Sequence, residues 1–239
     1  MKSRHLFTGV LLCLMCFICT LNSKAQTTKI AIVSVADTTF IHRHIGFTAF
    51  TNYVDTLPIN FSIINHIEGK LISYLKPGFS VSVVQLPDSV SKVKNKFFIS
   101  AKTKKVKEWI YNNKDLYDIV IVIDNAGLSE NNQLIPKNTS GIFSNHSYAS
   151  YYSTISFFAY RTSNLKLLEY YNLGGEFIQP IRNFKLPKER KGFTPEIINF
   201  VYDGFKNYLD SRVEYFLAKT YLLPQDKIDM IKAESGTIK

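Results

Sequence analysis

Acidic and imidazole side chains follow two apolar segments that have the composition of buried strands, residues 29–36 and 118–124. In an open α/β sheet, ligand sites form beyond the carboxyl ends of the strands, so these side chains are expected to face one crevice. Carboxylates and imidazoles in one crevice can carry out general acid–base hydrolysis or hold a divalent metal. The candidate catalytic residues are Asp37, His42, His44, Asp124 and His146.

The same residues also have a structural interpretation. Acidic residues after strands commonly cap the next turn, and a histidine in a polar loop is usually solvated. The chain contains no His-Glu-x-x-His zinc motif, no Gly-x-Ser-x-Gly nucleophile motif and no Gly-x-x-x-x-Gly-Lys-Ser/Thr phosphate loop. We therefore expect a non-enzymatic protein without metal or cofactor, and a secreted strand-end hydrolase is the alternative.

Aromatic side chains gather around a segment that is expected to form a β-hairpin. An exposed tyrosine-rich face could stack on sugars, so a glycan-binding module is a further alternative. The β-propensity of aromatic residues and one buried sheet face explain the same pattern. The residues are Tyr148, Tyr151, Tyr152, Phe158, Tyr160, Tyr170 and Tyr171.

Basic residues form two clusters in a chain that holds 29 Lys and Arg against 19 Asp and Glu. The first cluster spans residues 92–107 and includes Lys102, Lys104, Lys105 and Lys107, which are expected on a solvent face, and the second spans residues 182–191. Together they could form a patch that faces an anionic polymer or lipid headgroups. A solvated surface that serves solubility is the alternative.

Three short motifs begin with Asp followed by Ser or Thr, namely Asp37-Thr38-Thr39, Asp55-Thr56-Leu57 and Asp88-Ser89-Val90. This pattern is similar to the O-glycosylation acceptor of one group of Gram-negative bacteria. The resemblance implies glycan attachment at Thr38, Thr56 and Ser89.

The first 25 residues have the anatomy of a secretory signal peptide. Lys2 and Arg4 precede an apolar run over residues 6–21, and small residues stand before a cleavage point at Gln26. All three cysteines lie in this segment, and its removal would leave a net charge of +7. We expect a periplasmic, outer-membrane-associated or secreted protein that does not span the membrane. Export argues against nucleic acid as a partner and favours an envelope protein or polymer.

Strand and helix patterns alternate through the first half of the remaining chain. Apolar strands at 29–36, 79–86 and 118–124 are separated by amphipathic helices at 60–76 and 101–113. Two right-handed crossovers place the first strand between the other two in a parallel sheet.

The second half is expected to complete the same sheet. Residues 151–161 and 166–172 predict an antiparallel hairpin, and a long helix begins at Thr194-Pro195. Residues 37–59 and 125–147 are expected to be long loops, and the first could hold a short extended piece. The fold class is a three-layer Rossmann-like α/β domain with a mixed sheet of about five strands, over residues 26–232. Residues 233–239 are expected to be a frayed tail.

In order of elements, residues 29–222 resemble Rossmann-like envelope modules. These are the α/β domains of the curli-assembly lipoprotein and the amino-terminal domain of the Tol translocation protein. The third strand, introduced by Tyr117-Asp118, and the hairpin after it match that order. The resemblance implies a non-enzymatic binding or assembly module of the envelope.

Overall fold

A computed structural model describes residues 27–91, 93, 101–125, 136–173, 179–181, 186–187 and 192–236. The predicted signal peptide, residues 1–25, lies outside the described residues. Among the residues described, no helix has the length and apolarity needed to cross a bilayer.

The first sheet confirms the α/β fold class. Its strands lie in the order β4 (Ser80–Val83), β1 (Lys29–Ser34), β5 (Ile119–Asn125), β8 (Ile155–Arg161) and β9 (Lys166–Asn172). β1 pairs in parallel with both β4 and β5, as the crossover rule predicts, and the β8–β9 hairpin continues the sheet in antiparallel fashion. The apolar runs of β1 and β5 are buried because helices cover both faces of this sheet.

A second five-stranded sheet occupies segments that were expected to be loops. Its strands lie in the order β10 (Gln179–Pro180), β7 (Ala149–Ser153), β6 (Thr139–Asn145), β2 (Thr39–Ile45) and β3 (Tyr53–Thr56). The loop predictions for residues 37–59 and 125–147 were wrong to this extent. β2 and β6 carry Thr, Ser and His where a strand pattern needs apolar residues. These polar groups are buried because they bond to one another, as in the 2.8 Å contact between the Oγ atoms of Ser140 and Ser153.

The predicted strand 151–161 is divided between the two sheets. β7 ends at Ser153 in the second sheet and β8 begins at Ile155 in the first. Thr154 joins them, with its backbone N–H donating to the carbonyl of Thr139 at 3.0 Å. The sequence pattern is continuous across this junction, so it cannot reveal the change of sheet.

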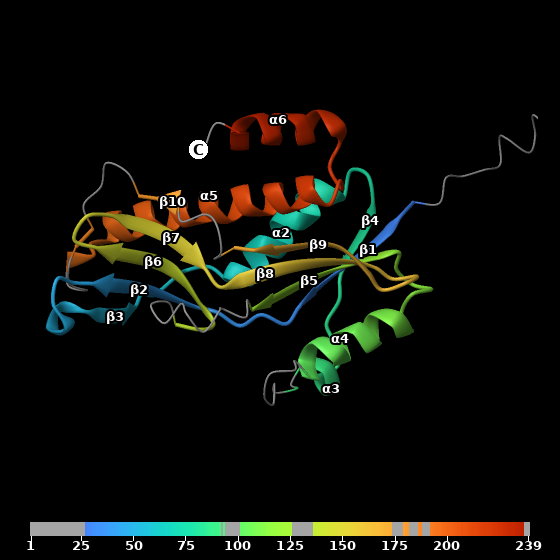
Figure 1. Cartoon of the computed structure of the whole chain (residues 1–239), viewed down its shortest axis with the longest axis horizontal. Coiled ribbons are helices and arrows are strands. Elements are labelled where there is room, and N and C mark those ends of the chain that lie inside the picture. Colours follow the sequence, from blue (N-terminus) through green and yellow to red (C-terminus); the bar gives the residue numbers. More distant parts are fainter. Residues whose placement is uncertain are drawn as a thin grey trace, which may run out of the picture.

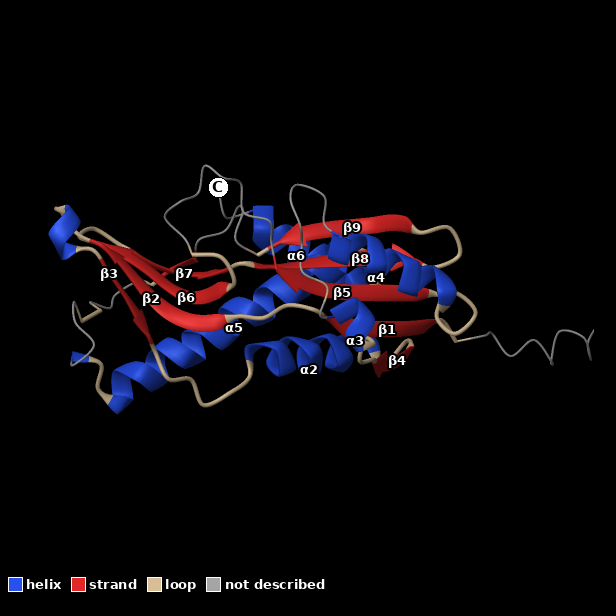
Figure 2. Cartoon of the chain, turned by 90° about the horizontal axis from the view of Figure 1, so that it is seen from below, coloured by secondary structure: helices blue, strands red, loops and turns tan. Residues whose placement is uncertain are grey.

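Helices complete the three layers. Figures 1 and 2 show α2 (Ile63–Leu75) and α5 (Pro195–Lys219) on one side of the first sheet, with α6 (Gln225–Gly236) stacked beyond α5. α3 (Asp88–Ser91) and α4 (Ala101–Asn112) lie on the other side. Residues 233–236, expected to be frayed, continue α6. The predicted start of α5 is confirmed, because the Thr194 side chain accepts a hydrogen bond from the Ile197 N–H and Pro195 follows it.

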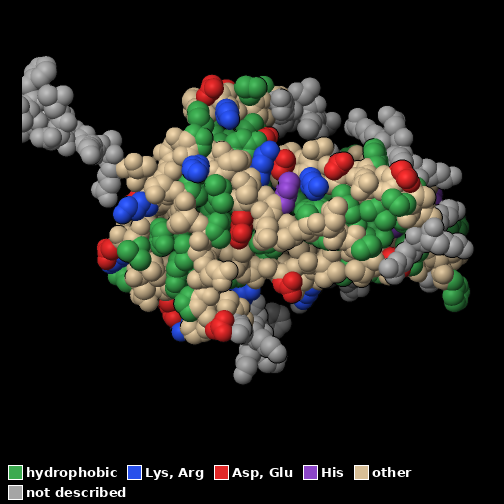
Figure 3. All heavy atoms as spheres, turned by 180° about the vertical axis from the view of Figure 1, so that it is seen from behind, with side chains coloured by type: hydrophobic (Ala, Val, Ile, Leu, Met, Phe, Trp, Pro, Cys, Tyr) green, Lys and Arg blue, Asp and Glu red, His purple; other side chains and the backbone are tan. Residues whose placement is uncertain are grey.

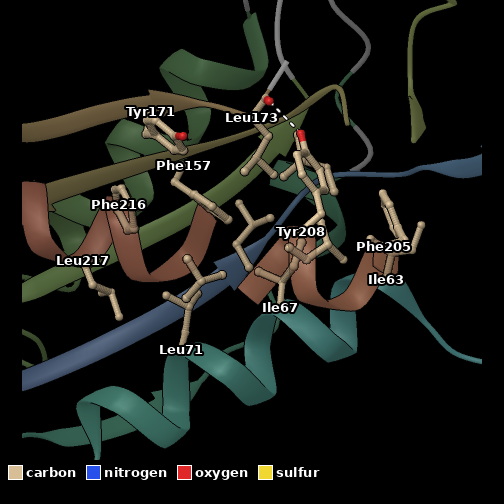
Figure 4. Close-up of a cluster of buried hydrophobic side chains, with 14 of the residues drawn as sticks. Ile63, Ile67, Leu71, Phe157, Tyr171, Leu173, Phe205, Tyr208, Phe216 and Leu217 are labelled. Carbon is tan, nitrogen blue, oxygen red and sulfur yellow. Dashed lines mark hydrogen bonds between the residues drawn. The ribbon is translucent and has the colours of Figure 1, made fainter. Parts of the chain in front are cut away.

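Helix α5 packs on both sheets and so joins them. Its 25 residues extend about 37 Å. In its first half, the Phe205 ring lies 4.9 Å from that of Phe40 on β2, and near its end the Phe216 ring lies 5.0 Å from that of Phe157 on β8. Between them the buried Tyr208 hydroxyl donates to the Leu173 carbonyl at 2.8 Å (Figure 4). One continuous hydrophobic core therefore spans both sheets.

A polar clamp fixes α2 against α5. The Asp210 carboxylate of α5 accepts hydrogen bonds from His66 and Lys70 of α2, each at 2.9 Å. The apolar faces beneath this clamp, which include Ile67 and Leu71, are fully buried. The helix pair is therefore held by packing, and the clamp sets its register.

Candidate functional site

Lys102 of α4 contacts the ends of β1 and β5, where the crevice with the catalytic residues was expected. Its ammonium group donates to the Val35 carbonyl oxygen at 2.6 Å and lies 3.8 Å from a carboxylate oxygen of Asp124. The Lys102 side chain is only 16% exposed, so its predicted place on a solvent face was wrong. Asp37 is exposed in the segment between β1 and β2.

His42 and His44 lie in the second sheet instead, on one face of β2. Their spacing of two residues points both imidazoles to the same side of a strand. Ser144 of β6 lies between them, with its Oγ 2.7 Å from His42 Nε2 and 2.9 Å from His44 Nδ1. The parallel register pairs His44 with Ser144. Sequence reasoning missed Ser144, and the His-x-His spacing within a strand is the signal that could have located this face.

Aromatic rings surround His42. The Tyr53 ring lies 5.2 Å away with its hydroxyl 3.3 Å from His42 Nδ1, and the Phe193 ring lies 5.3 Å away. Burial, together with the smaller effect of the neighbouring His44, lowers the pKa of His42 to about 4. His42 is therefore neutral at pH 7, with one nitrogen that donates and one that accepts.

A neutral His42 allows two proton arrangements along the chain Tyr53–His42–Ser144–His44. In the first, the Tyr53 O–H donates to Nδ1, Nε2–H donates to the serine oxygen, and the serine O–H donates to His44. In the second, every bond is reversed and the Tyr53 O–H donates to the Pro187 carbonyl at 3.4 Å. In either case the serine hydroxyl is held between two imidazoles, an arrangement that can position a group or activate a nucleophile.

A pocket of about 1020 Å³ opens beside this network. The β2–β3 turn with the 3-10 helix η1 (Ala49–Thr51), the β6–β7 turn, and the strands that carry Ser144 and Tyr53 form its walls. No Asp, Glu, Lys or Arg is among its lining residues within the described part of the chain. The lining residues are His44, Gly46, Phe47, Phe50, Thr51, Asn52, Tyr53, Ser144, Asn145, His146, Ser147, Tyr148, Ala149, Ile181, Leu186 and Pro187.

The structure separates the five candidate catalytic residues. His44 and His146 line the pocket, and Asp37 and Asp124 do not. His146 is exposed, and its ring lies 6.2 Å from that of Phe47. Within the described residues, no three His, Cys, Asp or Glu side chains are grouped to hold a metal ion.

The aromatic residues of the predicted hairpin are divided between core and surface. Tyr151, Tyr152, Tyr160 and Tyr171 are buried, which fits their structural interpretation. Tyr148 and Tyr170 are exposed, at 45% and 43%. Tyr148 lines the pocket, so it is the hairpin tyrosine placed to contact a ligand there.

The three glycosylation candidates differ in accessibility. Thr56 at the end of β3 and Ser89 in α3 are exposed. Thr38 is half-buried, and its hydroxyl lies 2.9 Å from the Ser140 hydroxyl. Attachment at all three positions stays a prediction.

Lys104, Lys105 and Lys107 of the first basic cluster are exposed on α4, and the lysines of this cluster before residue 101 lie outside the described residues. Lys105 pairs with Glu108 at 2.7 Å, and the Lys107 ammonium lies 5.6 Å from the centre of the Tyr160 ring. Most of the second basic cluster, residues 182–191, lies outside the described residues. On the face drawn in Figure 3, basic and acidic side chains are interspersed among apolar ones. The anion patch stays a prediction.

Comparisons with known proteins add little to this geometry. No family model matches the chain, and no curated protein matches it significantly. Among solved structures, it is similar to a Xanthomonas campestris protein of the DUF330 family. That similarity has 8% identity and a TM-score of 0.39 over 91% of this chain and 94% of the other. The functional assignment therefore rests on the residues of this chain.

Proposed function

We propose that this chain is an exported, non-enzymatic binding module of the bacterial cell envelope, with its ligand site in the pocket beside β2 and β6. The pocket itself is the observation that carries the proposal. Its volume of about 1020 Å³ lies at the upper end of the range of small-molecule sites. Its walls come from three separate segments held by the second sheet, so the site is built before a ligand arrives.

The lining favours an uncharged ligand group. Phe47, Phe50 and Tyr148 offer rings for apolar or stacking contacts. Asn52, Asn145 and Ser147 offer neutral hydrogen-bonding groups, although Asn145 already accepts from the N–H groups of Ser147 and Tyr148. The described walls supply no fixed charge to balance a phosphate or an ammonium group. The neutral parts of a saccharide, a lipid or an apolar peptide fit this lining.

Export is proposed from the sequence of residues 1–25 alone. The periplasm or the outer surface would then be where the pocket meets its ligand. Intact-mass measurement of the protein from an envelope fraction tests this step. A chain that begins at Gln26 supports it, and a chain that retains residues 1–25 contradicts it.

Filling the pocket mouth is expected to abolish ligand binding without unfolding the protein. Ser147 is exposed on the β6–β7 turn, so Ser147→Trp can place an indole over the opening. Ser163→Trp is the matched control, because Ser163 is also exposed in a turn but does not line the pocket. Panels of neutral saccharides, lipids and apolar peptides are screened by thermal unfolding. A ligand at 100 times its dissociation constant raises the melting temperature by about 5–10 °C.

The change in melting temperature shows whether a ligand binds in the pocket. The proposal expects a rise for the wild type and for Ser163→Trp, and no rise for Ser147→Trp. It fails if no compound raises the melting temperature of the wild type, or if Ser147→Trp responds equally.

A serine hydrolase is the second candidate, because Ser144 Oγ lies within hydrogen-bonding distance of two imidazoles and lines the pocket. In that case the serine Oγ would bond to the carbonyl carbon of an acyl group while an imidazole nitrogen takes its proton, and the imidazolium would pass that proton to the leaving group as the bond between the leaving group and the acyl carbon breaks. The binding proposal expects no labelling by a fluorophosphonate probe. Labelling of the wild type that is absent in Ser144→Ala would favour the hydrolase.

A further inference from the structure

We propose that the turn between β2 and β3 is a membrane-docking element, with Phe47 and Phe50 entering the interfacial region of a lipid bilayer. We call residues 46–52 the aromatic tip. The inference goes beyond the proposed function, because docking does not require a ligand in the pocket.

The exposure of the two rings is the first observation. Phe47 is 89% exposed and Phe50 is 99% exposed, the highest values among the described large hydrophobic side chains. They stand within four residues of each other on the same turn, and the exposed Tyr148 of the neighbouring turn lines the same pocket. Scattered exposed apolar residues are ordinary, but a cluster of aromatic rings commonly marks an interaction site.

The backbone of the tip is largely satisfied by its own polar groups. The Gly46 N–H donates to the Asn52 side-chain oxygen at 2.8 Å. The Thr48 N–H donates to the Thr51 hydroxyl oxygen at 3.1 Å, and that hydroxyl donates to the Thr48 carbonyl at 2.8 Å. The free-energy cost of moving a turn out of water is smaller when its polar groups bond to one another, because an apolar medium offers no partner to an unsatisfied polar group.

The charge distribution favours a lipid surface. Residues 46–54 contain no charged side chain, so no ion has to be desolvated when the tip enters the interface. Without residues 1–25 the chain carries a net charge of +7, which attracts an anionic leaflet over a Debye length of about 8 Å. Tyrosine beside the phenylalanines is also typical of residues at the headgroup level.

The size and position of the tip favour a bilayer over a protein partner. Two phenylalanine rings bury about 400 Å² together, roughly half of what one side of a standard protein interface requires. Figure 1 shows the β2–β3 turn at one extreme of the long axis of the molecule. The turn can therefore meet a lipid surface before most of the molecule does.

Vesicle sedimentation tests the proposal. The full sequence is expressed in bacteria, and the purified protein is mixed with phosphatidylcholine vesicles containing about one quarter phosphatidylglycerol. Phe47→Ser/Phe50→Ser is expected to lower the partition coefficient by roughly tenfold or more, since it removes the apolar surface that enters the interface. Phe50→Ser alone is a second variant, with a smaller loss. Leu116→Ser/Met230→Ser removes two exposed apolar residues elsewhere, and it is expected to change binding less than twofold.

Each outcome supports or overturns the proposal. The melting temperatures of the tip variants are expected to match that of the wild type, because both rings are exposed. A match shows that a loss of vesicle binding is not caused by unfolding. Vesicle binding that the tip variants leave unchanged overturns the proposal. If that unchanged binding weakens as the salt concentration rises, the lysines of α4 are the surface that binds the vesicles. Loss of self-association in the tip variants, with vesicle binding intact, would make the tip a protein contact. Failure here leaves the pocket experiment unaffected, because that experiment uses Ser147→Trp and soluble ligands.

Discussion

Replacing Gly141 by alanine is expected to lower the free energy of unfolding by about 3 kcal/mol or more. Gly141 lies on β6 with a φ of 140°, a backbone conformation that residues with a Cβ rarely adopt. A Cβ at this position would stand 2.0 Å from the carbonyl oxygen of Ile41. Gly141 and Ile41 are register partners, so the added Cβ meets backbone atoms, and relief requires β2 and β6 to separate. The same strands carry His42, His44 and Ser144, so the site would be lost with the pairing.

Gly69→Ala is the matched control for this substitution. Gly69 is exposed within α2, and a Cβ there meets no atom within 4 Å. Alanine in a helix interior is expected to raise stability by about 0.5–1 kcal/mol. Urea unfolding followed by circular dichroism measures both variants. Equal stability of Gly141→Ala and the wild type would show that β2 and β6 are not paired at this register.

Acidification from about pH 6.5 to pH 4 is expected to cost about 3 kcal/mol of stability through His42 alone. Burial lowers the pKa of His42 from its ordinary value of 6.5 to about 4, and the adjacent His44 contributes. In this window the unfolded chain binds a proton that the folded protein does not, so the equilibrium moves toward unfolding as the pH falls. The stability is fully present above pH 6.5, and the loss is complete below about pH 4.

His42→Gln isolates this contribution from that of the carboxylates. Glutamine can keep a hydrogen bond to Ser144 but does not titrate. The free energy of unfolding of the variant is therefore expected to depend less on pH between 4 and 6.5 than that of the wild type. The free energy of unfolding is measured by urea titration at several pH values, and the slopes of variant and wild type are compared. Identical slopes would mean that His42 is accessible to solvent and has an ordinary pKa.

The first sheet was predictable because its residues carry a strong local signal. The central residues of β1 and β5, 30–33 and 119–123, are apolar and mostly β-branched, a composition typical of a strand covered on both faces. Thr194 and Pro195 likewise mark the start of α5 through groups that act on the adjacent turn. The α/β class, the position of β1 between β4 and β5, and the β8–β9 hairpin follow from such local patterns.

The second sheet and the site on it were decided by tertiary structure. β2 and β6 contain threonine, serine and histidine, whose burial is stable only because partners distant in sequence satisfy them. Ser144 meets His42 across 102 residues, and neither segment predicts the other. The sequence does not distinguish Lys102 from the exposed lysines of α4, because its partners, the Val35 carbonyl and Asp124, come from distant strands. Hydrophobic periodicity records which face of a segment is apolar, but it holds no information about which polar groups will meet.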